Sequence, residues 1–343
     1  MPSKPSILAA VGIAGAALVL AACSNGRQTP SASSSSAGGG GTSGAITIEY
    51  IQKQGTQQYF VDEANGAKAE AQQLGNVTVK VVDVESDSNA AINAINTAIA
   101  QKVSAIALVA PDQKIGPQAI QLAQQAGIPL IASDDPLQAG DGSAAPFVGF
   151  DSTQMGQSVG QEAGQLYQQS GWTSANTRII NVEKQDLSDC VDRGKGALAA
   201  FQQVVGSDIP KVIDEGTDAT TPDALNRTGA IITANPGVKN WVVWGCNDES
   251  ETGAVTALAN AGFGANNVIG VGLGAYLDCK DWQAGKSTGN KAALYIGGKD
   301  VGATAVKALV AKVRNGTALP AKSIAPTSMV TPTNWQQSGM TCS

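Results

Sequence analysis

The chain has 343 residues and a formal net charge of −6, and its 22 basic and 28 acidic side chains are scattered rather than clustered. Because it has no basic patch or stripe, it lacks the electrostatic footprint of a nucleic-acid-binding protein, and we expect no nucleic-acid partner. It contains no histidine, which excludes mechanisms that need a histidine base and zinc sites that need histidine ligands.

The N-terminal residues have the pattern of an export signal. Lys4 precedes an apolar run, residues 7–20, that is too short to cross a bilayer core of roughly 30 Å. Small residues and a cysteine follow as Leu20-Ala21-Ala22-Cys23, which resembles the lipobox of bacterial lipoproteins. We therefore predict a signal peptide over residues 1–22 and a lipid on Cys23. An ordinary cleaved signal with a chance cysteine is the alternative.

The next segment is rich in serine and glycine and has no large apolar side chain to bury. Residues 23–45 are therefore predicted to be a lipidated cysteine and a flexible linker that ties the protein to the outer face of the cytoplasmic membrane. The residues that follow exceed the size at which one hydrophobic core usually stops growing. We expect two domains.

From Ile46 to about Val330, runs rich in Val and Ile alternate with Ala/Gln-rich stretches of helical period. This alternation is typical of parallel sheets covered by helices. The predicted strands cover residues 46–51, 77–83, 105–110, 129–133, 177–182, 211–215, 241–245 and 268–272. The predicted helices cover residues 57–74, 89–101, 114–126, 153–169, 193–205, 222–234, 249–261 and 301–314. The pattern divides near Phe150, which predicts an α/β fold of two doubly wound, Rossmann-like domains.

Polar side chains follow the predicted strands, where doubly wound sheets bind their ligands. These post-strand positions are Lys53, Gln57, Tyr59, Asp134, Asp135, residues 186–193, Asn247, Asp248 and residues 272–276. A small sugar or polyol needs this mixture, because carboxylates accept its hydroxyl protons, cationic and amide groups donate to it, and aromatic rings cover its C–H face. Each residue alone has a structural explanation too. Asp135 can form a turn with Pro136, Asp248 can be a helix N-cap, and Arg193 can pair with Asp189.

Four cysteines remain after Cys23, and an even number in an exported chain favours disulfides. Three pairings are possible. We favour Cys190 with Cys246 and Cys279 with Cys342, since the first two lie just after strands of one predicted sheet. Zinc is the rival interpretation, but no Cys-x-x-Cys pair occurs, so we expect no metal site.

Four stretches of the chain carry a family resemblance: residues 50–54, 129–135, 235–241 and 245–248. In these, and from about Ile46 to Trp335, the chain resembles the periplasmic pentose- and hexose-binding proteins of ABC transporters, most closely those for L-arabinose. The resemblance implies a type I periplasmic binding protein fold with a multi-strand hinge near Phe150, Ile296 and Ala325. It implies lobes of residues 46–150 plus about 297–325, and 151–296 plus about 326–343.

The resemblance also implies roles for individual residues. Lys53 matches a family lysine that donates to sugar hydroxyls, and Asp134 and Asp135 match an acidic pair of the family. Arg193 matches an arginine that lies near the ring oxygen of the sugar. Asn247 matches a family asparagine. Tyr59 stands where the family has a tryptophan, with Phe60 beside it.

Three departures from the family pattern put arabinose itself in doubt. Gln57 replaces a glutamate, Asp189 a threonine and Gly274 a second asparagine. The ligand is thus left open among pentoses, hexoses and open-chain polyols. The family further implies a membrane permease as partner, a monomer and no cofactor.

Enzymes are the main alternative class. Residues 156–160 fit a Gly-x-Ser-x-Gly elbow, but the histidine base is missing. Residues 285–287 suggest a phosphate loop, yet Lys280 stands where its first glycine should be. Residues 270–275 fit a dinucleotide fingerprint but come late in the chain, and we interpret them as a close-packed strand-to-loop junction. Glycoside hydrolysis by paired carboxylates, and a sensor of the same fold, remain open.

Overall fold

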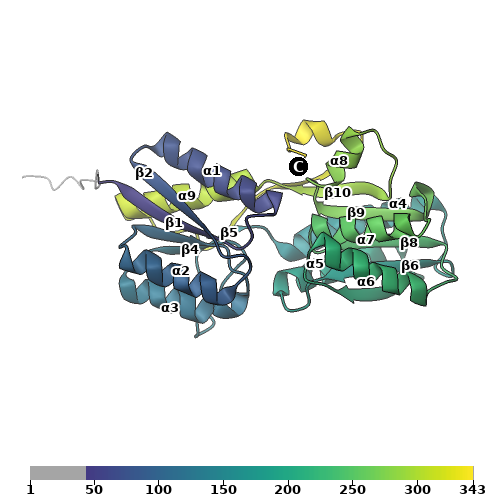
Figure 1. Ribbon diagram of the computed structural model, residues 1–343, viewed down its shortest axis with the longest axis horizontal. Coiled ribbons are helices and arrows are strands. Elements are labelled where there is room, and N and C mark those ends of the chain that lie inside the picture. The colour runs from purple at the N-terminus through teal and green to yellow at the C-terminus, as the bar shows by residue number, and fades with distance from the viewer. Residues whose placement is uncertain (1–43, 343) are drawn as a thin grey trace, which may run out of the picture. The chain divides into compact units, whose positions relative to one another are not determined.

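The computed structural model describes residues 44–342. The predicted signal peptide, Cys23 and nearly all of the predicted linker lie outside these residues. Within them, no helix combines the length and the apolar character needed to cross a membrane. The described chain forms two six-stranded sheets covered by helices (Figure 1).

The first sheet has the order β11-β5-β4-β3-β1-β2, and all its pairs are parallel. Its strands are β1 (Ile46–Gln52), β2 (Val77–Asp83), β3 (Ala105–Leu108), β4 (Leu130–Asp134), β5 (Phe147–Gly149) and β11 (Ser323–Ile324). Helices α1 (Gln58–Leu74) and α9 (Gly298–Asn315) cover one face, and α2 (Ser88–Ala100) and α3 (Gly116–Ala126) the other. A short 3-10 turn, η1 (Gln113–Ile115), precedes α3.

The second sheet has the order β12-β10-β9-β8-β6-β7, with β12 alone antiparallel to its neighbour. Its strands are β6 (Thr177–Glu183), β7 (Lys211–Gly216), β8 (Asn240–Gly245), β9 (Val268–Gly274), β10 (Asn290–Ile296) and β12 (Thr327–Val330). Helices α4 (Ser152–Ser170) and α5 (Ser188–Val205) cover one face, and α6 (Thr221–Ala234) and α7 (Asp248–Asn260) the other. The short helix α8 (Asp278–Gln283) follows β9.

The chain leaves the first sheet after β5, returns to it with α9, and crosses again between β11 and β12. The lobe that holds the first sheet is called the N-lobe below, and the lobe that holds the second the C-lobe. Two doubly wound parallel-sheet lobes joined by several crossing segments confirm the predicted fold class.

The elements missing from the prediction are short or poor in β-branched residues. β5 has only 3 residues, α8 has 6, and β10 reads NKAALYI. The prediction for α5 was wrong at its start, which is Ser188 rather than Arg193. Asp189 and Cys190 therefore lie on the first turn of a helix instead of before it, and Arg193 lies inside the helix rather than at its start.

The Gly-x-Ser-x-Gly residues 156–160 form a contact between two helices. It lies inside α4, which packs on α5, and a Cβ on Gly160 would lie 1.9 Å from the carbonyl oxygen of Ala197. A Cβ on Gly156 would lie 2.0 Å from that of Arg193. The Ser158 hydroxyl donates to the carbonyl of Gln154, as helical serines often do. Close packing of two backbones explains this motif.

Candidate ligand-binding cleft

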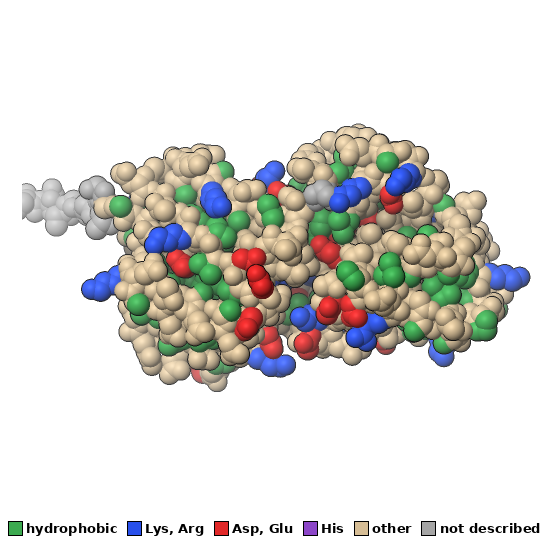
Figure 2. Space-filling view, in the orientation of Figure 1, with side chains coloured by type: hydrophobic (Ala, Val, Ile, Leu, Met, Phe, Trp, Pro, Cys, Tyr) green, Lys and Arg blue, Asp and Glu red, His purple; other side chains and the backbone are tan. Residues whose placement is uncertain are grey.

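Residues from both lobes line one cleft at the carboxyl ends of the strands. The predicted site residues that line it are Lys53, Gln57, Tyr59, Phe60, Asp134, Arg193 and Asn247. Asp135 and Asp189 lie behind this lining. Figure 2 shows acidic side chains gathered near the middle of the molecule, with basic side chains beside them.

Lys53 is the central cation of the N-lobe wall. It follows β1, its side chain is 14% exposed, and its Nζ bonds Asp135 Oδ2 and lies 3.9 Å from Asp134 Oδ2. The Phe60 ring centroid is 5.2 Å from Nζ, a cation–π contact. Burial lowers the pKa of Lys53, but the two carboxylates raise it further, and the net pKa is above its usual value. Lys53 thus stays charged.

Asp134 and Asp135 face the same lysine, although side chains of neighbouring strand residues normally point apart. The reason is the backbone of Asp134, which ends β4 in the left-handed region with φ 62°. Burial raises the pKa of Asp135 to about 6 against the opposing effect of Lys53, and Asp189 raises it as well. Both acids lie at the end of β4 next to the same lysine, an arrangement unlike the two carboxyls that flank the bond in a glycosidase.

On the C-lobe wall, Arg193 comes from α5. Its Nη1 donates to the carbonyl oxygen of Cys246 at 2.9 Å, and its buried Nε has no partner among the described residues. No ion pair with Asp189 forms, contrary to the structural alternative considered for this pair. A disulfide joins Cys190 to Cys246, so α5 is tied to the loop after β8. The second disulfide joins Cys279 to Cys342, and both are the pairings that the sequence favoured.

Asn247, rather than Asp248, is the N-cap of α7. Its Oδ1 accepts from the backbone N–H of Ser250 at 3.1 Å and its Nδ2 donates to the carbonyl of Ala219 at 3.0 Å. Asp248 is fully buried and accepts from the backbone N–H groups of Ala275 and Leu277. Asn247 therefore has little hydrogen-bonding capacity left for a ligand.

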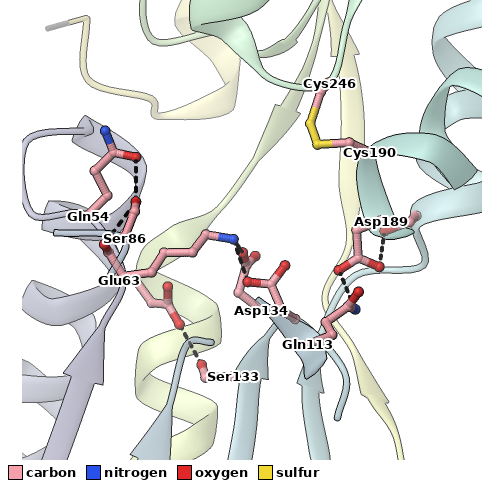
Figure 3. Close-up of polar contacts among 12 residues, drawn as sticks. Gln54, Glu63, Ser86, Gln113, Ser133, Asp134, Asp189, Cys190 and Cys246 are labelled. Atoms are coloured by element: carbon pink, nitrogen blue, oxygen red, sulfur yellow. Dashed lines mark hydrogen bonds and ion pairs between the residues drawn. A yellow bond between two sulfur atoms is a disulfide. The ribbon is translucent and has the colours of Figure 1, made fainter. Parts of the chain in front are cut away.

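Asp189 links the two lobes. Its carboxylate accepts from Gln113 Nε2 of the N-lobe at 3.2 Å and from Ser152 Oγ at 3.1 Å (Figure 3). Gln113 also donates to the carbonyl of Pro136 and accepts from Ser188. No local sequence pattern marks Gln113, because its partners lie far away along the chain.

A second layer of polar groups lies under the N-lobe wall. Tyr50 and Ser133 both donate to Glu63 Oε1 at 2.5 Å, and all three side chains are buried. The pKa of Glu63 is raised to about 8, mainly because the carboxyl is buried and secondly because the charge of Asp134 is close. Sequence reasoning missed this layer, although Glu63 follows Tyr59 by one helical turn and thus faces the same way.

Comparison with known proteins agrees with this geometry. Residues 48–317 match the family described as periplasmic binding protein domain. The ABC transporter L-arabinose-binding periplasmic protein of Azospirillum brasilense is 26% identical over 297 residues, 85% of this chain and 88% of that protein. The L-arabinose-binding periplasmic protein of Escherichia coli K12 is 24% identical over 248 residues, 71% of this chain and 74% of that protein.

A solved structure also resembles this one. The ABC transporter periplasmic solute binding protein of Actinobacillus succinogenes 130z, bound to D-allose, superposes with a TM-score of 0.74 at 26% identity, covering 85% of this chain and 99% of that one. These relatives are named as binding proteins and not as enzymes, in keeping with the prediction.

Proposed function

Because the chain belongs to the periplasmic binding protein family, we propose that it captures a monosaccharide or a sugar alcohol in its cleft and delivers it to an ABC importer. The relatives for L-arabinose and the neighbour bound to D-allose support a sugar as the ligand class. The family also implies a place outside the cytoplasm.

One observation carries the proposal: polar atoms at the cleft are buried without a partner among the described residues. They are Tyr59 Oη and Arg193 Nε in the lining and Asp135 Oδ1 behind it. Buried polar groups are nearly always hydrogen-bonded, so these atoms fit a ligand that brings its own donors and acceptors. A hydroxyl provides one donor and two acceptors, and a sugar provides several hydroxyls on a small frame.

The remaining parts of the proposal concern location and partners. We propose a lipid on Cys23, a tether up to residue 45, and a monomer that meets a membrane permease. The two ligand-binding lobes are residues 46–150 with about 297–325 and residues 151–296 with about 326–343. A sensor that passes the signal to a receptor is the second candidate, and neighbouring genes for a permease and an ATPase would favour transport.

A thermal-shift screen over pentoses, hexoses and polyols tests the function. A ligand at 100 times its dissociation constant adds about 2.7 kcal/mol to the free energy of unfolding, which is a clear rise in melting temperature. No shift with any sugar or polyol would contradict the proposal. Release of nitrophenol from nitrophenyl glycosides would instead show an enzyme.

Arg193→Met should weaken binding of any ligand found in that screen by about 5- to 150-fold. The variant keeps the approximate length of the side chain but leaves a buried ligand hydroxyl unpaired, which costs about 1–3 kcal/mol of binding free energy. Isothermal titration calorimetry measures the effect. Arg178→Met is the matched control, because Arg178 also donates to backbone carbonyls but does not line the cleft. Equal affinities for both variants would mean that the site is misplaced.

Gln113→Ala should weaken binding of every ligand by the same factor, a few-fold. Gln113 joins the lobes without lining the cleft, so its loss favours separation of the two lobes and does not change the fit of one particular ligand. Titrations with two different ligands measure the two factors. Gln124→Ala on the exposed side of α3 is the control. An effect confined to one ligand would show that Gln113 acts by direct contact.

A further inference from the structure

The two walls of the cleft differ in the polar atoms that they offer. On the N-lobe side, Lys53, Asp134 and Tyr59 are polar residues of the lining, and the Tyr59 hydroxyl is buried without a hydrogen-bond partner among the described residues. On the C-lobe side, the buried lining includes Leu187, Cys190, Cys246, Leu273 and Tyr276, each at most 7% exposed. Lys184, Arg193, Asp218 and Asn247 are the polar C-lobe residues of the lining; Lys184 is half-buried and Asp218 exposed.

Two polar side chains of the C-lobe wall, Tyr276 and Asn247, are occupied by hydrogen bonds within the protein. The Tyr276 hydroxyl donates its proton to the carboxylate of Glu249, whose two oxygens lie 3.0 and 2.8 Å away. This proton is therefore not available for a hydrogen bond to a ligand. The Asn247 side chain caps α7 and bonds Ala219. Arg193 and Lys184 are then the cationic donors of this wall, and both lie outside the group formed by Leu187, the disulfide, Leu273 and Tyr276.

The backbone also prevents a further polar side chain from reaching the ligand here. Gly274 follows Leu273 with φ 140°, and a Cβ at this position would lie 2.6 Å from the Tyr276 ring. Gly274 is the position where the family resemblance implied an asparagine. The disulfide meanwhile fixes two weakly polar sulfur atoms at the wall, next to Leu187 (Figure 3).

We propose that Leu187, the Cys190–Cys246 disulfide, Leu273 and Tyr276 form an apolar subsite, which takes a methyl or deoxygenated carbon of the ligand. This inference rests on the proposed function and narrows its ligand class to deoxy or methyl-bearing sugars and polyols. A hydroxyl placed against this wall would lose its water without gaining a partner, whereas a methyl group would gain apolar contact.

Pairs of sugars that differ by one hydroxyl test the subsite. Titration calorimetry would compare D-fucose with D-galactose, L-rhamnose with L-mannose, and 6-deoxy-D-glucose with D-glucose. In at least one pair the deoxy sugar should bind five times more tightly or better. Equal or tighter binding of the hydroxylated member in every pair that binds would overturn the subsite while leaving sugar binding intact. No binding by any sugar or polyol would overturn both.

Leu187→Asn provides the matching variant. Leu187 is the N-cap residue of α5 and makes no side-chain cap, so asparagine suits the position and the fold should be retained. The ratio of affinities within the preferred pair should fall at least threefold. Leu198→Asn on the same helix, away from the cleft, is the control, and its ratio should match the wild type. The ratio is insensitive to a loss of folded protein, so an unchanged ratio in Leu187→Asn would count against the subsite.

Discussion

Lys53→Met should lower the free energy of unfolding by about 3–5 kcal/mol at pH 7, because it removes the cation from a buried cluster and leaves two carboxyls facing each other. Its partner Asp135 has a side chain that is only 1% exposed. Water cannot replace the lost charge there. Urea denaturation measures the change, with ligand left out so that stability and binding are not mixed.

Two comparisons make the Lys53 experiment specific. The loss should be smaller at pH 5 than at pH 7, because Asp135, with its pKa of about 6 and higher still without Lys53, can take up a proton. Adding Asp135→Asn should recover part of the stability. The control is Lys322→Met, which removes a 3.0 Å ion pair with Asp151 from a lysine that is 58% exposed. That surface pair should contribute at most about 1 kcal/mol. Equal losses for the two lysines would refute the argument.

Stability should fall as the pH rises from about 5 to 8.5, because the C-lobe buries a cluster of carboxyls. Asp248, Glu251 and Asp278 are fully buried, and both carboxyl oxygens of Glu251 lack a partner among the described residues. The pKa values of Glu251 and Asp278 are raised well above their usual values. Burial is the main cause, and the negative charge of the neighbouring acids is the second.

The sign follows from proton linkage. An acid whose pKa is raised in the folded state holds a proton there that the unfolded chain releases, so folding is favoured at low pH and loses this advantage as pH rises. The decline begins near the ordinary carboxyl pKa values of 3.8 and 4.5. It extends through the pKa values of Asp135 at about 6, Glu215 at about 7 and Glu63 at about 8.

Glu251→Gln isolates the contribution of the cluster. Glutamine has the same shape and stays neutral, so the free energy of unfolding should decline less steeply with pH than in the wild type. Urea denaturation at pH 5, 7 and 8.5 gives the slope. Glu85→Gln is the control, since this side chain is exposed and its carboxylate is solvated in both states. A wild-type stability that rises with pH over this range would contradict the prediction.

The sequence alone determined the fold class and much of the cleft. The alternation of apolar runs and helical stretches is a local signal. It predicts the fold class because each helix or strand must bury one apolar face in the folded protein. Lys53, Asp134 and Arg193 could be found for a related reason. The carboxyl ends of parallel strands meet at one edge, so polar residues just after strands come together there.

Only the tertiary structure decided which of these groups keep free polar atoms. Gln113 and Asp189 are 76 residues apart, and Ser133 and Glu63 are 70 apart, so no local pattern marks either contact. The left-handed turn at Asp134, the cap made by Asn247 and the hydroxyl of Tyr276 used by Glu249 likewise depend on neighbours in space. A hydrogen bond satisfied within the protein is not available to a ligand, and its partner is known only when the chain is folded.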